Sequence, residues 1–412
     1  MAQLNITLNQ EEILQLISEN QCDAFKKLLQ ESLNKILLAE SSEQIKAERY
    51  AREEGRTDYR NGSRERGLVT RIGKVTLQVP RHRNLPFKTL VFENYSRSEA
   101  ALIAGMAEMV VNGVSTRKVS RVMETLCGES FSKSTVSEVC KDLDNSVNIF
   151  RMRPIEGEYP FLTVDATYFK VREDSRIISK AFMIAYGTNT LGHREILGFG
   201  TYPNESTVTW TDFFMGLKKR GLKGVLMITS DAHDGILNAI TKVFPTVPWQ
   251  RCQFHFARNI VDKAPKKYQS GIRTELQEIF NSKSIVEARK IRDRIVDDYR
   301  DVAESAMECL EEGFESAMTV MILPIGMRKY YRTSNNIERL NRELKRRSKV
   351  IGVFPNEGSI VRLMGSVLLE QNEILQTGRA IFRQDTLISM MGSSVPAQLI
   401  RIAKEQQQLR VA

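Results

Sequence analysis

The pattern of apolar residues predicts that the chain begins with a helical region. From Glu11 to about Glu54 the apolar residues recur at the spacing of one face of a helix. The residues of this stripe are Leu28, Leu29, Leu33, Ile36 and Leu37. We expect the stripe to be buried, as a packing face within the chain or as a dimer face.

The next segment, from Arg56 to Arg83, is basic and has a different pattern. It holds eight Lys and Arg against two acids. Val75 to Val79 alternate between apolar and polar residues, as in a strand, and Gly73 and Lys74 suit the turn of a short hairpin. We expect a basic arm or hairpin that contacts phosphates, with a flexible linker as the alternative. Its candidate contacts are Arg60, Arg64, Arg66 and Arg71.

Ser98 to Ile149 reads as a run of helices, part of which has helix-turn-helix character. Ser115 starts one helix, Gly128 ends it, and Ser132 or Ser134 caps the next. The second helix would face a DNA groove, as recognition helices do, and a plain helical bundle is the alternative. Its candidate DNA contacts include Lys133 and Lys141.

From Tyr159 onward the pattern becomes rich in strands. The expected elements are strands at Phe161 to Val171, Ile177 to Tyr186 and Glu195 to Thr201, a helix at Ser206 to Arg220, and strands at Val225 to Ile228 and Trp249 to Phe256. This order is that of an RNase H-like core. Asn259 to about Met321 then reads as helical. We therefore predict an α/β core, a mixed sheet with flanking helices, that carries an all-helical insertion.

Two aspartates stand in or beside the predicted buried strands. Asp165 interrupts the first strand, and Asp231 stands just past the C-terminal end of the predicted strand Val225 to Ile228. An unpaired buried carboxylate is costly, and open α/β sheets place their sites at the carboxyl ends of strands. A structural turn or helix cap is the alternative for each, and Asp234 is a further candidate cap.

A third acid, Glu338, lies on a predicted helix within Tyr331 to Pro355 whose same face is basic. Asn341, Arg342 and Lys345 fall beside Glu338 at 3.6 residues per turn. A separate stripe of Ile337, Leu340 and Leu344 would seat the helix, and Ser334 or Asn335 would cap it. Glu343 lies about 140° away round the helix. A solvated helix with paired charges is the alternative.

Together, Asp165, Asp231 and Glu338 predict a site for hard divalent cations. Mg²⁺ prefers oxygen ligands, and two such ions can activate the attacking oxygen and stabilise the leaving oxygen of a phosphodiester reaction. We expect two Mg²⁺ or Mn²⁺ ions per site, with Arg342 and Lys345 contacting the DNA backbone.

Composition is consistent with a nucleic-acid partner. Sixty Lys and Arg against fifty Asp and Glu give a net charge of +10 and a pI near 9.3. No apolar run is long enough to span a membrane, and five scattered cysteines argue against a disulfide framework. We expect an intracellular protein with no membrane partner.

Four segments resemble the Mutator-type transposases of bacterial insertion sequences. They are VDATYFKVRE, SDAHDGI, RCQFHFARN and TSNNIERLNRELKRRSKVIGVFPN, with RNGSRERGLVTRIGKVTLQVPRHRN upstream. The resemblance implies a DDE transposase with an RNase H-like core, in which Asp165, Asp231 and Glu338 are the catalytic metal ligands. It also implies double-stranded DNA partners, namely terminal inverted repeats and target DNA, a homodimer or larger synaptic complex, a copy-out route, and a cytoplasmic, nucleoid-associated location.

On this basis the chain divides into seven predicted regions. They are an N-terminal helical region (1–55), the basic arm or hairpin (56–97), a helix-turn-helix-like DNA-binding domain (98–155), the first part of the catalytic core (156–258), the helical insertion (259–330), the last part of the core (331–375) and a C-terminal tail (376–412).

The pair Cys252 and His255 allows three interpretations. A zinc site needs four ligands, and no second Cys or His pair lies nearby in the sequence. The resemblance implies a supporting role in the active site, in which His255 contacts a phosphate near Asp231. A hydrogen-bonded core histidine is the third interpretation.

Other function classes fit less well. There is no Walker-type phosphate loop and no convincing Ser-His-Asp context. The main competitor is a transposase-derived, non-catalytic DNA-binding regulator that binds through residues 56–150. A nuclease on the same fold is the third option.

Overall fold

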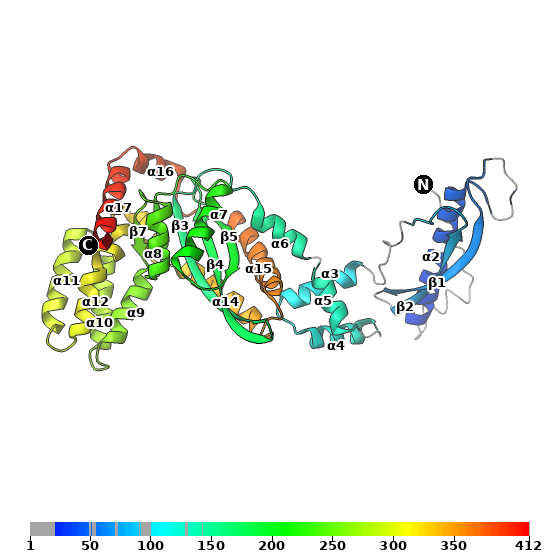
Figure 1. Cartoon of the computed structure of the whole chain (residues 1–412), viewed down its shortest axis with the longest axis horizontal. Coiled ribbons are helices and arrows are strands. Elements are labelled where there is room, and N and C mark those ends of the chain that lie inside the picture. Colours follow the sequence, from blue (N-terminus) through cyan, green and yellow to red (C-terminus); the bar gives the residue numbers. More distant parts are fainter. Residues whose placement is uncertain are drawn as a thin grey trace. The chain divides into compact units, whose positions relative to one another are not determined.

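The computed structural model describes residues 21–48, 51, 55–70, 73–89, 91, 100–127, 131–141 and 143–411. The chain divides into two compact units, Met1–Asp142 and Leu143–Ala412, and each is described by itself (Figure 1).

The first unit begins with a helix that packs on a hairpin. The helix is α2 (Gln21–Ile45), and the antiparallel strands are β1 (Arg60–Thr70) and β2 (Gly73–His82). Val75, Leu77 and Val79 are buried in one cluster with Leu37 of α2, so the predicted hairpin and its alternation are confirmed.

The prediction of a helix reaching Glu54 is wrong at its end. Helix α2 stops at Ile45, because Lys46 has a left-handed φ of 56° and the N–H groups of Lys46 and Ala47 bond back to the carbonyls of Glu43 and Ser42. Residues 11–20 of that prediction lie outside the described residues.

The described residues between 100 and 141 are mainly helical. They form α3 (Ala100–Val111), α4 (Thr116–Cys127) and α5 (Lys133–Lys141), whose shared core includes Met106, Val119, Met123 and Val136. The Ser132 hydroxyl accepts a bond from the Thr135 N–H at 3.0 Å, as predicted for a cap. The two predicted helices are confirmed, and Gly128 lies outside the described residues.

A mixed sheet of five strands forms the centre of the second unit. The strands are β3 (Phe161–Glu173), β4 (Arg176–Thr188), β5 (Arg194–Tyr202), β6 (Met227–Ser230) and β7 (Trp249–Arg251). Their order is β5-β4-β3-β6-β7, in which β3, β4 and β5 pair antiparallel, while β6 is parallel to both β3 and β7.

Helices cover both faces of this sheet. On one face, Trp210 and Phe214 of α7 (Thr207–Lys219) pack with Leu162 and Met183, together with α8 (Asp234–Val243). The opposite face is covered by α6 (Leu143–Met152), α14 (Asn335–Ser348) and α15 (Glu357–Thr377). The α/β character of the core is thereby confirmed.

The helical insertion has a hydrophobic core of its own. It consists of α9 (Gln253–Lys263), α10 (Gln269–Asn281), α11 (Ile285–Tyr299) and α12 (Glu304–Ala317). A 3-10 turn, η1 (Thr319–Ile322), and α13 (Ile325–Tyr331) lead back to the core.

The prediction that the fifth strand continues to Phe256 is wrong. Its partner β6 ends at Ser230, which pairs with Arg251, so no ladder remains beyond that residue. Cys252 begins α9 instead, and Phe256 and Ile260 lie at helical spacing and are buried in the core of the insertion. The insertion therefore starts earlier than Asn259.

The C-terminal helices are α16 (Gln384–Met391) and α17 (Val395–Val411). Leu387 and Met390 are buried with Phe161 and Met227 of the sheet. The Gln406 side chain accepts a bond from the N–H of Trp249 and donates one to its carbonyl, both at 2.8 Å. Within the described residues, no helix has the length and apolarity needed to cross a membrane.

Candidate active site

Asp165 lies on β3 and faces α14. Its Oδ1 accepts a bond from the N–H of Ala166 at 2.9 Å, and its Oδ2 accepts one from the Asn341 Nδ2 at 2.8 Å. Burial raises the pKa of Asp165 to about 7, the nearby carboxylate of Asp231 adds to the rise, and His255 opposes it. The site thus holds a carboxyl group whose charge is poorly compensated by the protein alone.

Asp231 follows directly after β6, and the strand register places it level with Asp165. Thr163 and Thr229 are paired in the parallel ladder of β3 and β6, and each aspartate comes two residues after one of them. The two aspartates are therefore close enough for their charges to interact. The Asp231 side chain is 44% exposed.

Glu338 lies on the first turn of α14, three residues before Asn341 on the same helix. The helix therefore brings an acid and the amide that holds Asp165 to one place. The Glu338 Oε1 lies 3.4 Å from the hydroxyl of Ser334, which can donate to it.

His255, on the first turn of α9, stands between two of the acids. Its Nε2 lies 3.7 Å from the Glu338 Oε1, and its Nδ1 lies 3.9 Å from the Asp231 Oδ1. The pKa of His255 is raised to about 9 by its hydrogen bond with Cys252 and by the charges of Cys252, Asp231 and Glu338, against the effect of burial. The two aspartates, the glutamate and the histidine thus come from four elements to one site.

Cys252, the N-cap residue of α9, helps to hold this arrangement in place. It is fully buried, and its Sγ accepts bonds from the N–H and the hydroxyl of Ser334 at 3.3 and 3.1 Å. Cys252, His255 and Glu338 have ligand atoms within 4.8 Å of one another, so the fold brings a third donor to the pair. Neither the bonds from Ser334 to Cys252 nor the bond from Asn341 to Asp165 was predicted. Contacts between distant segments leave no local pattern in the sequence.

The remaining predicted residues of α14 lie on its surface. Arg342 and Lys345 are exposed. Glu343 bonds to Arg346 and Arg347, and the bonds from Arg346 above all lower the pKa of Glu343 to about 2. Its separation from Glu338 agrees with the predicted helical angle.

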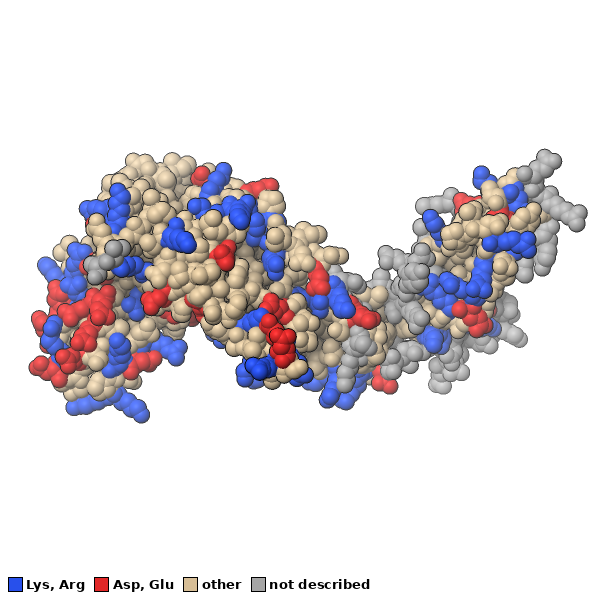
Figure 2. All heavy atoms as spheres, viewed as in Figure 1, with Lys and Arg blue, Asp and Glu red and all other residues tan. Residues whose placement is uncertain are grey.

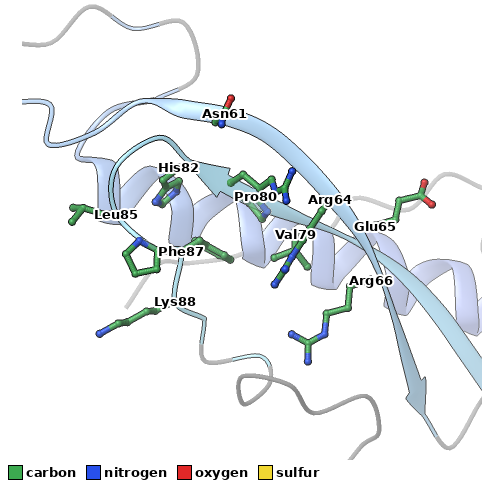
Figure 3. A pocket seen from close by; sticks show the side chains of 12 residues that line it. Asn61, Arg64, Glu65, Arg66, Val79, Pro80, His82, Leu85, Phe87 and Lys88 are labelled. Atoms are coloured by element: carbon green, nitrogen blue, oxygen red, sulfur yellow. The ribbon is translucent and has the colours of Figure 1, made fainter.

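The basic hairpin contains a pocket of about 860 Å³ (Figure 3). Arg64, Arg66, Arg81 and Lys88 line it, together with apolar residues such as Phe87. The pocket is therefore bounded by positive charge and can accept an anionic group.

The other predicted DNA contacts have different positions. Arg60 is bonded to the Ser42 hydroxyl and the Ala47 carbonyl, at 2.8 and 3.0 Å, and so ties the hairpin to the end of α2. Lys141 is exposed on α5. Arg71 and the side chain of Lys133 lie outside what the structure describes.

Comparison with known proteins gives the chain a family. Residues 1–378 match the model described as "Transposase, Mutator family". The chain belongs to the Mutator family of transposases. The resemblance inferred from the sequence is confirmed.

Several curated relatives of this Mutator chain are insertion-sequence transposases. The transposase for IS256 in transposon Tn4001 of Staphylococcus aureus is 43% identical over 377 residues, which cover 90% of this chain and 96% of the relative. Those for ISRM5 of Rhizobium meliloti and IS1081 of Mycobacterium tuberculosis are 38% and 36% identical, and the matches cover 89% and 87% of this chain and 92% and 86% of the relatives. A transposase role is supported accordingly.

Proposed function

We propose that this Mutator-family chain is a DDE transposase that cuts DNA at the ends of an insertion sequence and joins them to another strand. The observation that carries the proposal is the position of Asp165 on β3 beside Asp231, which directly follows the adjacent parallel strand β6. Glu338 lies 3.7 Å from His255 and on the same helix as Asn341, which bonds to Asp165. An RNase H-like core is supported by three antiparallel strands followed by two strands that are parallel to the first.

The donor set fits hard divalent cations. Asp165, Asp231 and Glu338 offer carboxylate oxygens, and a bound cation would favour the charged form of Asp165, whose pKa is raised chiefly by burial and further by the charge of Asp231. These residues would hold two Mg²⁺ or Mn²⁺ ions. When bound, such ions supply Lewis-acid activation of the attacking oxygen and neutralise charge on the leaving oxygen.

The neighbouring residues would position the acids and the substrate. Asn341 orients Asp165, and Ser334 links Glu338 to Cys252. His255 carries ring N–H groups between Asp231 and Glu338, where they can donate to a phosphate oxygen. In the first step water breaks a phosphodiester bond and releases a 3′-hydroxyl; in the second, that hydroxyl attacks another strand and exchanges one phosphodiester for another.

The DNA partners would be terminal inverted repeats and target DNA, held by the basic hairpin and by α4 and α5. Arg64 and the pocket around it provide positive charge for the backbone (Figure 3). Two ends must be joined, so a homodimer or larger assembly is part of the proposal. The names of the relatives give no support to a non-catalytic regulator.

Single substitutions test the assignment. Asp165→Ala, Asp231→Ala and Glu338→Ala should each abolish cleavage and strand transfer in Mg²⁺, while binding to end DNA stays nearly intact, because in this proposal the acids bind metal and do not contact DNA. Glu343→Ala is the matched control on the same helix and should retain activity. A Glu338→Ala protein that still cleaves in Mg²⁺ would show that the assignment is wrong.

A further inference from the structure

A second pocket of about 640 Å³ lies between α9, α10 and the turn that precedes α14. This volume falls within the range of small-ligand sites, roughly 300–1,000 Å³. Phe254 and Phe280 contribute aromatic surface, and Arg258, Arg273 and Arg332 contribute positive charge. The pocket therefore combines an aromatic surface, which can stack on a base, with positive charge, which can bind a phosphate.

Like Tyr168 on β3, Phe254 is an exposed aromatic residue of the second unit. Its side chain is 48% exposed, whereas Phe256, two residues later on the same helix, is fully buried in the core of the insertion. Single exposed apolar residues are common on protein surfaces, so the exposure of Phe254 matters here because the residue lines a pocket of suitable size. Phe254 thus offers an aromatic surface that the fold itself does not cover.

The position of Phe254 places the pocket beside the catalytic acids. Its ring centroid lies 5.6 Å from that of the adjacent His255. His255 in turn approaches Asp231 and Glu338 within 4 Å, at 3.9 and 3.7 Å. A DNA strand with its phosphate at the acids would therefore bring a neighbouring nucleotide to Phe254.

The arginines give the pocket a charge that differs from the rest of the insertion. Figure 2 shows acidic side chains gathered over α11 and α12, and pairs such as Arg289 with Glu315 neutralise that surface. The pocket is lined by three arginines and one acid, Asp262, which forms an ion pair with Arg258 at 3.5 Å, so Arg273 and Arg332 remain in excess. Arg332 is held in place by the Phe280 carbonyl and the Asn281 side chain, at 3.2 and 3.0 Å.

We propose that this pocket binds one unstacked nucleotide next to the cleaved phosphodiester, with its base on Phe254 and its backbone near the arginines. Base stacking on an aromatic side chain tolerates any sequence, and guanidinium groups match phosphate geometry. Removing the base from the helix exposes the adjacent phosphate to the acids, at a cost that is lower for an unpaired base. The inference rests on the proposed function in that it requires DNA at the acids.

The test compares two DNA probes on the full chain without divalent metal. Both are duplexes that carry the end sequence found beside this coding region, with 2-aminopurine next to the cleavage position, and only one has a mismatch there. The wild-type chain should bind the mismatched probe more tightly and increase 2-aminopurine fluorescence. Phe254→Ala should weaken binding of the mismatched probe about tenfold and abolish the fluorescence change, and Phe254→Trp should retain both.

Two controls make the outcome decisive. Val286→Ala, which changes a side chain that is 60% exposed on α11, should behave as wild type. Asp231→Asn should keep the probe preference without metal and, in a separate assay with Mg²⁺, should lose cleavage. If Asp231→Asn still cleaves, the proposed catalysis is wrong and the pocket stands. If Phe254→Ala retains the preference, or weakens both probes equally, the pocket proposal is overturned.

Discussion

Replacement of Asp165 by Asn is expected to stabilise the protein in the absence of metal. Burial raises the pKa of Asp165 from its ordinary value of 3.8 to about 7. Between these values the folded chain holds a proton that the unfolded chain has lost. The free energy of unfolding therefore falls as pH rises, and the whole contribution is lost above about pH 7. Asn carries no charge and avoids this penalty.

The size of the effect follows from the pKa values. A change from 3.8 to about 7 corresponds to about 4 kcal/mol, at 1.36 kcal/mol for each pH unit. This is an upper limit, because water and the His255 ring relax around the charge. Asn also loses one acceptor toward Ala166 or Asn341. We expect Asp165→Asn to match wild type near pH 4 and to be more stable by about 1–2 kcal/mol at pH 8.

Urea unfolding in EDTA at pH 4 to 8 measures the difference. Glu343→Gln is the control with the opposite sign, because the pKa of Glu343 is lowered to about 2. Its charge stabilises the fold above its ordinary pKa, and that contribution is lost as pH falls through about 2. At pH 8 this control should be destabilised, by at most about 1 kcal/mol for a partly exposed pair. A stability difference for Asp165→Asn that does not change with pH would refute the reasoning.

Three further predictions concern other parts of the chain. His255→Ala should fold and bind end DNA but cleave about tenfold more slowly, equivalent to about 1.4 kcal/mol in the barrier. Unfolding of this variant would favour a core histidine. Stoichiometric zinc in the wild type would contradict both the active-site role and the core histidine. Gln406→Ala should lower the free energy of unfolding by about 1–2 kcal/mol in urea titration, because the N–H of Trp249 loses its side-chain acceptor and its carbonyl keeps only the Thr319 hydroxyl as a side-chain donor. An unchanged midpoint would contradict this. Arg64→Ala should lower the salt dependence of DNA binding by about one phosphate contact, with an unchanged slope as the contrary result.

Local patterns in the sequence predicted most of the core. The five strands were predicted because apolar runs and charged turns alternate clearly between Phe161 and Arg251. The position of Asp231 after its strand followed from the same pattern. Ser132, one of the two residues predicted to cap α5, does cap it. These features depend on neighbours within a few residues, which a single sequence records.

Features that depend on distant segments were not predicted. The run Trp249 to Phe256 is apolar enough for a strand, and only the length of its partner β6 limits it to Arg251. The end of α2 depends on the left-handed Lys46, which carries no Gly or Asn signal. In the site, the bond from Asn341 to Asp165 joins residues 176 positions apart. Such contacts arise from the fold as a whole.

The C-terminal helices connect to the site through the edge of the sheet. Residues 379–412 lie beyond the region that matches the family model, and Gln406 of α17 satisfies both backbone groups of Trp249 on the edge strand β7. The Trp249 indole donates to the Ser230 hydroxyl at 2.9 Å, and Ser230 directly precedes Asp231. The Ser230 carbonyl accepts from the N–H of Cys252, which begins the helix that carries His255. A short edge strand with unpaired backbone groups would hold the neighbouring site residues poorly. By bonding to Trp249, the tail therefore stabilises the part of the sheet from which Asp231 and His255 both extend.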